Sequence, residues 1–239
     1  MKLDILAFGA HPDDVELGVG GTLAKSAAAG KKVGVIDLTE GELGTRGSVS
    51  ERRQEAAEAS HVLGVQHREN MGFRDGFLTD SEAYQRALIQ KIRQFQPEIV
   101  FCNAIRDRHI DHPRGSALVS SACFLSGLVK IETKDAAGSP QLAWRPKQVL
   151  HYIQWQDITP NVCLDISGYL DQKLNAVKAY RSQFYDPASN APETPISSKN
   201  FLDSISYRAQ NLGRLIGVAA AEGFTTEKPV ALDSWEHLL

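Results

Sequence analysis

The first half of this chain alternates between short apolar segments and longer segments with helical spacing, and this alternation limits the folds that it can adopt. Residues 3–9, 32–38 and 98–102 are apolar runs with the length of buried strands, and 67–71 is a less apolar candidate. The segments between them carry helix signals; they are residues 17–29, 48–63 and 81–95. Strands joined through helices by short connections are typical of a parallel sheet with right-handed crossovers. The sequence therefore predicts an α/β fold with a Rossmann-like, mostly parallel sheet flanked by helices.

Single residues mark where several of these helices begin and end. Ser48 and Glu51 have the spacing of a capping box, in which each satisfies a free backbone N–H of the other. Gly30 is a good C-terminal stop. Pro97 ends the helix before residues 98–102 because it cannot continue a helical hydrogen-bond ladder.

The second half is predicted to complete the same domain. Helices are expected at residues 114–128, from about 167 to 184, and at 200–216, with strands at 149–156 and 162–166. Residues 186–198 are rich in Pro, Ser and Asn and are predicted to form a surface loop. No repeat or linker divides the chain. We therefore expect one domain over residues 1–239, with a small β-containing C-terminal extension.

The composition argues against several classes of function. The 239 residues are 42% hydrophobic and carry a net charge of −3, and no block of Lys and Arg supports binding to nucleic acid or to an anionic membrane. No apolar stretch approaches the ~20 residues that a membrane span needs. Cys102, Cys123 and Cys163 are far apart, which predicts neither a disulfide framework nor a zinc finger. A cytoplasmic protein is expected.

Polar clusters follow two of the predicted strands. Carboxyl ends of parallel strands meet at one edge of a sheet, so the two clusters are predicted to face each other. Imidazole and carboxylate groups together suit a catalytic divalent metal such as zinc, which takes three protein ligands and keeps a position for water. A remaining carboxylate would act as the base and a His⁺ would stabilise an oxyanion, but spacing alone does not assign these roles. The clusters are His11, Asp13 and Asp14, and His109, Asp111 and His112.

Gly18, Gly20 and Gly21 could suggest a phosphate-binding loop, but the dinucleotide fingerprint requires a further Gly where Leu23 stands. We interpret these small residues as allowing a helix to pack closely on the sheet. There is no P-loop motif and no Gly-x-Ser-x-Gly elbow.

The two polar clusters resemble the motifs of one enzyme family. Ala10-His11-Pro12-Asp13-Asp14, paired with His109-Ile110-Asp111-His112, is similar to the pattern of the zinc-dependent LmbE/PIG-L deacetylases. Residues 38–45, 182–184 and 221–224 resemble the branch that deacetylates N-acetylglucosaminyl malate. The resemblance implies metal-dependent hydrolysis of this acetamide in bacillithiol biosynthesis. The alternatives are another N-acetylglucosamine substrate, such as diacetylchitobiose or a mycothiol-type conjugate, and a non-catalytic metal-binding protein.

The resemblance also implies roles at the metal and at the reacting bond. His11, Asp14 and His112 would bind zinc, or Fe²⁺ in the cell, and Asp13 would be the general base. His109, with its ring held by Asp111, would be a protonated group that stabilises the oxyanion or assists the leaving amine. Arg52 would bind the substrate, because its fork geometry suits a carboxylate such as that of malate.

Other polar residues are given ordinary roles. Asp107 is expected to belong, with Arg106 and Arg108, to a charged loop, and Asp75 to a turn or rim. Trp155 is interpreted as a packing residue, with the mouth of a pocket as the alternative. The remaining histidines are expected to be structural or exposed; they are His61, His67, His151 and His237. The partner implied by the resemblance is a small N-acetylglucosaminyl substrate, and relatives form homo-oligomers, often hexamers.

Overall fold

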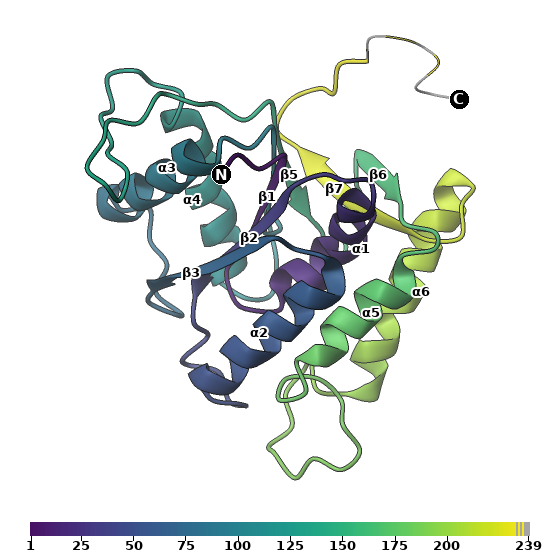
Figure 1. The fold of residues 1–239 in the computed structure, drawn as a ribbon. Helices are drawn as coiled ribbons and strands as arrows, with labels where there is room; N and C mark the ends of the chain where they lie inside the picture. Colours follow the sequence, from purple (N-terminus) through teal and green to yellow (C-terminus); the bar gives the residue numbers. More distant parts are fainter. Residues whose placement is uncertain (233, 235, 237–239) are drawn as a thin grey trace.

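A seven-stranded sheet forms the centre of the molecule (Figure 1), a computed structural model that describes all residues except 233, 235 and 237–239. The strand order is β3-β2-β1-β4-β5-β7-β6. The first five strands run parallel, and β7 runs antiparallel to both β5 and β6. The strands are β1 (Ile5–Gly9), β2 (Val33–Thr39), β3 (His67–Phe73), β4 (Ile99–Cys102), β5 (Gln148–Tyr152), β6 (Val162–Asp165) and β7 (Ala221–Thr226). The predicted α/β domain with a mostly parallel sheet is confirmed, and His237 lies outside the described residues.

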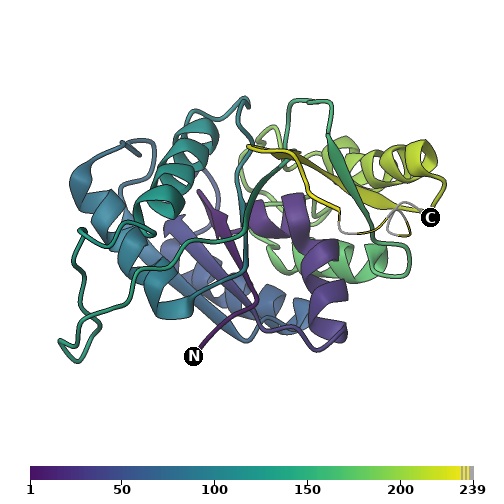
Figure 2. The ribbon, with the colours of Figure 1, turned by 90° about the horizontal axis from the view of Figure 1, so that it is seen from above.

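Helices cover both faces of the sheet. Figures 1 and 2 show α3 and α4 on one side, and α1, α2, α5 and α6 on the other. Among the described residues, we find no helix with the length and apolar character needed to span a bilayer. The helices are α1 (Asp14–Ala28), α2 (Val49–Leu63), α3 (Glu82–Phe95), α4 (Asp111–Leu125), α5 (Leu170–Ala179) and α6 (Lys199–Ile216).

The alternation of side chains along β1 divides the core into two layers. Leu6 and Phe8 point to the face covered by α3 and α4, and they pack with residues such as Leu88. Ile5 and Ala7 point to the opposite face, where α1 covers them. A strand buried on both faces needs apolar residues throughout, which explains why residues 5–9 show no polar position.

Close contact between α1 and the sheet depends on two glycines. A Cβ on Gly18 would lie 2.1 Å from the ring of the buried Tyr152, and one on Gly21 would lie 2.7 Å from Ile166. No real side chain fits at these distances. The predicted packing role of these small residues therefore holds for Gly18 and Gly21.

Several boundaries differ from the predictions, and three of them have a local cause. α1 begins at Asp14, three residues before the predicted start at residue 17, and α4 begins at Asp111 instead of residue 114. Both helices start with a carboxylate, which the positive end of the helix dipole stabilises, and Pro113 is tolerated because it lies in the first turn. α5 ends at Ala179, earlier than the predicted residue 184, because Tyr180 leaves helical geometry with ψ 65°.

The last strand, β7, contacts α1, which lies near the other end of the sequence. Glu222 of β7 accepts hydrogen bonds from two backbone N–H groups inside α1, those of Gly21 (2.9 Å) and Thr22 (2.7 Å). The same carboxylate pairs with the buried Lys173 of α5. One buried carboxylate thus connects α1, α5 and β7.

Candidate active site

The two polar clusters meet at the carboxyl edge of the sheet. β1 and β4 are parallel neighbours, so the loops that follow them lie side by side. The ring of His11 lies 4.6 Å from that of His109 and 5.6 Å from that of His112, between centroids. The structure thus brings together the histidines that the sequence places about a hundred residues apart.

Asp14 lies between two of these imidazoles. Its Oδ2 is 3.5 Å from Nδ1 of His11, and its Oδ1 is 3.1 Å from Nε2 of His112. Asn103 and Gln154 donate side-chain hydrogen bonds to the same carboxylate, at 3.0 and 2.7 Å. Burial opposes its ionisation, but the two histidines outweigh this and hold the pKa of Asp14 well below its usual range. Asp14 is therefore an ionised carboxylate held in one orientation between the two imidazoles.

His112 is held in one orientation by Asp107. Nδ1 of His112 pairs with the Asp107 carboxylate, which leaves Nε2 facing Asp14. Burial disfavours the charged imidazole, yet the Asp14 charge and the hydrogen bonds of both carboxylates raise the pKa of His112 to about 9. A carboxylate that holds one ring nitrogen, while the other points into the site, is the usual arrangement around a metal-binding imidazole.

The other side of His11 faces more carboxylates. Its Nε2 lies 3.0 Å from Asp75 Oδ1 and 3.7 Å from Asp111 Oδ2. Two sets of side chains therefore offer ligand atoms within 4.8 Å of one another: His11, His109 and His112, and His11, Asp75 and Asp111. Neutral imidazoles and ionised carboxylates are ligands that a borderline divalent cation accepts. The residues present fit a divalent metal.

Asp13 has an unusual backbone beside this cluster. Its φ of 114° is rare for a residue other than Gly and carries a strain of about 1–3 kcal/mol, which the surrounding structure must support. Arg52 supplies part of this support, donating to Asp13 Oδ2 at 3.2 Å and to the Pro12 carbonyl at 2.6 Å. Burial raises the pKa of Asp13 to about 7 against the opposing charge of Arg52. A buried carboxyl group with this pKa suits general base catalysis at neutral pH.

The guanidinium of Arg52, predicted to bind the substrate, lines the cavity and makes several contacts within the protein. It is 5% exposed, and besides Asp13 and Pro12 it binds the Gly41 carbonyl at 3.2 Å. The fork that we expected to hold a substrate carboxylate is therefore engaged with the protein itself. Its contacts are those of a group that orients Asp13.

His109 and Asp111 also differ from expectation in detail. The backbone N–H of Asp111 donates to Nδ1 of His109 at 3.3 Å, whereas the Asp111 carboxylate accepts from the N–H of Gly76 at 2.6 Å and faces His11. The ring is held by the backbone because Asp111 is the first residue of α4, where N–H groups lack helical partners. Burial and the charges of His11 and His112 lower the pKa of His109. A neutral ring whose Nδ1 accepts must carry its proton on Nε2.

Sequence reasoning missed four residues that organise the cluster. Asp107 and Asp75 were expected in a loop and on a rim, yet each hydrogen-bonds a ligand-type histidine. Asn103 and Gln154 were not singled out. Asn103 directly follows β4, and Gln154 lies two residues after β5, at the same edge of the sheet. That position after a parallel strand was the available signal.

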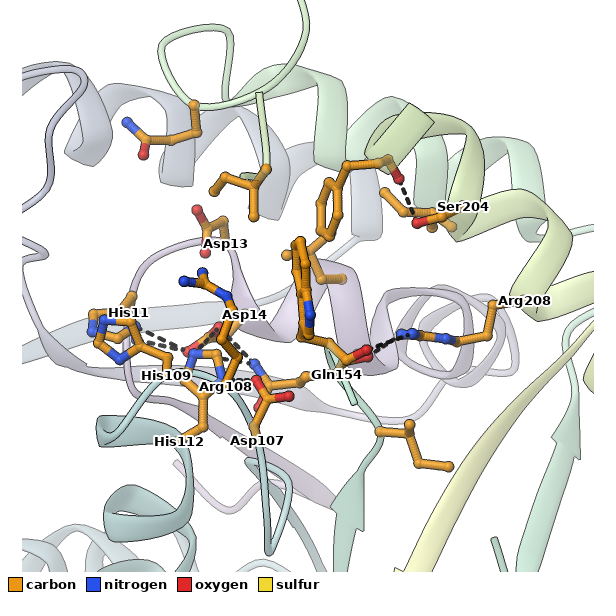
Figure 3. A pocket seen from close by; sticks show the side chains of 18 of the residues that line it. His11, Asp13, Asp14, Asp107, Arg108, His109, His112, Gln154, Ser204 and Arg208 are labelled. Atoms are coloured by element: carbon orange, nitrogen blue, oxygen red, sulfur yellow. Dashed lines mark hydrogen bonds and ion pairs between the residues drawn. The ribbon is translucent and has the colours of Figure 1, made fainter. Parts of the chain in front are cut away.

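The cluster opens into a cavity of about 360 Å³ (Figure 3). Its polar end contains the histidines and Asp13, and its other end is formed mainly by α6. Trp155 and Phe201 stack in its wall with ring centroids 5.5 Å apart, so the alternative of a pocket-lining Trp155 applies. A His/Asp cluster that fits a divalent metal, a buried carboxyl group and an adjoining cavity form an arrangement suited to metal-assisted hydrolysis.

Comparisons with known proteins agree with this arrangement. A family model described as GlcNAc-PI de-N-acetylase (PIG-L) matches residues 6–123. The uncharacterized deacetylase YaiS of Escherichia coli is 35% identical over 188 residues, which cover 74% of this chain and 90% of the relative. The chain belongs to the PIG-L/LmbE family of deacetylases.

Solved structures share the fold over almost the whole chain. The conserved protein TT1542 from Thermus thermophilus is 36% identical with a TM-score of 0.86, and the match covers 98% of each chain. The N,N'-diacetylchitobiose deacetylase from Pyrococcus horikoshii, solved with its inhibitor MPG, is 27% identical with a TM-score of 0.80. That match covers 93% of this chain and 82% of the other.

Proposed function

We propose that this protein is a zinc-dependent deacetylase that hydrolyses the acetamide of N-acetylglucosaminyl malate in bacillithiol biosynthesis. The observation that carries the proposal is Asp13, which is buried beside the His/Asp cluster in a strained backbone conformation. A carboxylate held in this way suits the role of a catalytic base better than a purely structural role. The relative from Pyrococcus horikoshii is named as a deacetylase of diacetylchitobiose, which supports an N-acetylglucosamine unit as the part of the substrate that reacts.

In this proposal His11, Asp14 and His112 hold the metal, which is Zn²⁺, or Fe²⁺ in the cell. When bound, the metal would supply Lewis acidity at the acetamide carbonyl. Two observations support these three residues as the ligands. Asp14 lies between the two imidazoles, and Asp107 holds the far nitrogen of His112. The second set of ligand atoms, which includes Asp75 and Asp111, surrounds His11 with negative charge.

Asp13 and His109 perform the proton transfer and the charge stabilisation. An Asp13 carboxylate oxygen takes a proton from the water that attacks the acetyl carbon, and the same proton then goes to the departing nitrogen. The C–N bond breaks to give acetate and the free amine. His109 donates a hydrogen bond from Nε2 to the oxygen that becomes negative, since its Nδ1 already accepts from Asp111. Arg52 keeps Asp13 in its unusual conformation.

The testing experiment is free-amine release from N-acetylglucosaminyl malate, measured beside N-acetylglucosamine and diacetylchitobiose, with zinc-loaded and chelator-treated protein. We expect release that requires metal and strongly favours the malate glycoside. Metal-dependent release that favours diacetylchitobiose would overturn the pathway and assign the second candidate, to which the Pyrococcus relative points. Release from none of the three compounds would refute this substrate assignment and return the substrate to unknown.

We further propose that the protein acts in the cytoplasm as a homo-oligomer, with a hexamer as the expected state. Light scattering coupled to gel filtration tests the assembly, and a monomeric mass at micromolar concentration would contradict it.

A further inference from the structure

One cation in the cavity has no task in the mechanism above. Arg108 lies in the loop between β4 and α4, directly before His109, and its side chain is exposed and lines the cavity. Figure 3 shows it rising from beside His109, with its guanidinium extending towards the region of Asp13. The guanidinium carbon is 4.9 Å from the centre of the Trp155 ring. This contact holds the cation over an aromatic face and leaves its N–H edges free.

The other cations of the cavity are already engaged. Arg52 binds Asp13 and two carbonyl groups, and Lys173 pairs with Glu222. Arg208 donates to the carbonyl groups of Gln154 and Trp155 and lies 3.3 Å from Asp157. Within the described part of the chain, Arg108 is the cavity-lining Lys or Arg that makes neither an ion pair nor a side-chain hydrogen bond.

The charge distribution explains what such a group would do. The catalytic end of the cavity carries the carboxylates of Asp13, Asp14, Asp75 and Asp107, which already face Arg52, the histidines and the proposed metal, so this end offers no further free cation to an anionic substituent. A substrate with a negative group beyond its sugar therefore needs a cation of the cavity wall that is free to pair with it. A planar guanidinium can give two parallel hydrogen bonds to a carboxylate or a phosphate, and the Trp155 ring orients its plane.

We propose that Arg108 is a specificity-determining residue that binds an anionic substituent, a carboxylate or a phosphate, on the group attached to the sugar of the substrate. The proposal rests on the proposed deacetylase function and names the class of substrate for that site. It assigns an anion contact to Arg108, whereas the terminal nitrogens of Arg52 already bind Asp13, Pro12 and Gly41.

The test compares charged and uncharged substrates in one variant. Arg108→Met keeps an unbranched, flexible side chain at this position but removes the guanidinium, with its charge and its contact with Trp155. We expect kcat/KM for N-acetylglucosaminyl malate to fall by about 10- to 100-fold, the loss typical of a charge-assisted pair of hydrogen bonds. The value for the dimethyl ester of the same conjugate should change by less than about threefold, because the ester offers no charge to bind. N-acetylglucosamine 1-phosphate distinguishes phosphate from carboxylate recognition.

Two further variants make the outcome specific. Arg106 is exposed in the same loop but does not line the cavity. Arg106→Met should therefore leave kcat/KM unchanged for every substrate. Arg108→Lys should recover part of the loss, because it restores the charge without the fork. An equal loss in Arg108→Met for the malate conjugate and its ester would overturn the specificity role while leaving the deacetylase function intact. A wild-type protein that deacetylates none of these compounds would instead refute the proposed function.

Discussion

At the scale of single residues, Asp13 combines a rare backbone conformation with nearly complete burial. We predict that Asp13→Asn lowers kcat by about 10²- to 10⁴-fold, since the amide cannot accept the proton of the attacking water. Zinc content, measured by elemental analysis, should stay at the wild-type level, because Asp13 is not among the proposed ligands. Asp171→Asn, an exposed change in the first turn of α5, is the control. Activity close to wild type in Asp13→Asn would refute its role as the base.

A second prediction concerns the carboxylate behind His112. Asp107→Asn should weaken zinc affinity by about 10- to 100-fold, because Asp107 fixes the ring and its tautomer without touching the metal. His112→Ala should abolish stoichiometric binding altogether. Competition with a fluorescent chelator measures both affinities. Equal affinity in Asp107→Asn and wild type would show that His112 needs no support from this side.

The residues of the site differ in how far the sequence predicts them. His11, Asp14 and His112 stand in short motifs next to strands, so their meeting follows from the parallel sheet alone. The partners of these residues depend on loop conformation: Asp75 reaches His11 because its backbone N–H binds Glu42 and its carboxylate binds the N–H of Leu43. Such loop geometry leaves no periodic signal in a sequence.

At the scale of elements, apolar runs and caps predicted most of the fold. The capping box of Ser48 and Glu51 is present with both hydrogen bonds, because it depends only on residues three apart. β7 was not predicted as a separate strand, since Glu222 and Gly223 interrupt any strand-like pattern. Its strand conformation comes from pairing with β5 and β6 on its two sides, which are contacts distant in sequence.

The glycines of α1 give a prediction at this scale. Gly18→Ala should lower the free energy of unfolding by about 1–3 kcal/mol or more, because its methyl group would overlap the Tyr152 ring. Gly20→Ala is the matched control on the same helix: its methyl group would make an ordinary contact, 3.4 Å from Lys173, and alanine should stabilise the helix by up to about 1 kcal/mol. Urea unfolding measures both changes, and equal midpoints would contradict the packing account.

At the scale of the whole molecule, Glu222 links the beginning and the end of the described chain. We predict that Glu222→Ala lowers the free energy of unfolding by about 3–5 kcal/mol, because Lys173 would be left as a buried charge without a partner. Lys173→Met should cost less, since Glu222 would keep its two hydrogen bonds from α1. Thermal and urea unfolding of the two variants test this order. A larger loss in Lys173→Met would show that the hydrogen bonds to α1 contribute little.

The position of β7 between β5 and β6 has a consequence for folding during translation. In the described sheet, β6 pairs with β7, which is made more than fifty residues later. The proposed metal ligands are translated early, but α1 lacks its hydrogen bonds to Glu222 until that residue has emerged. Contacts of such long sequence separation form late and slowly. A nascent chain must therefore wait, with an open sheet edge and an unfinished cavity, until β7 has left the exit tunnel.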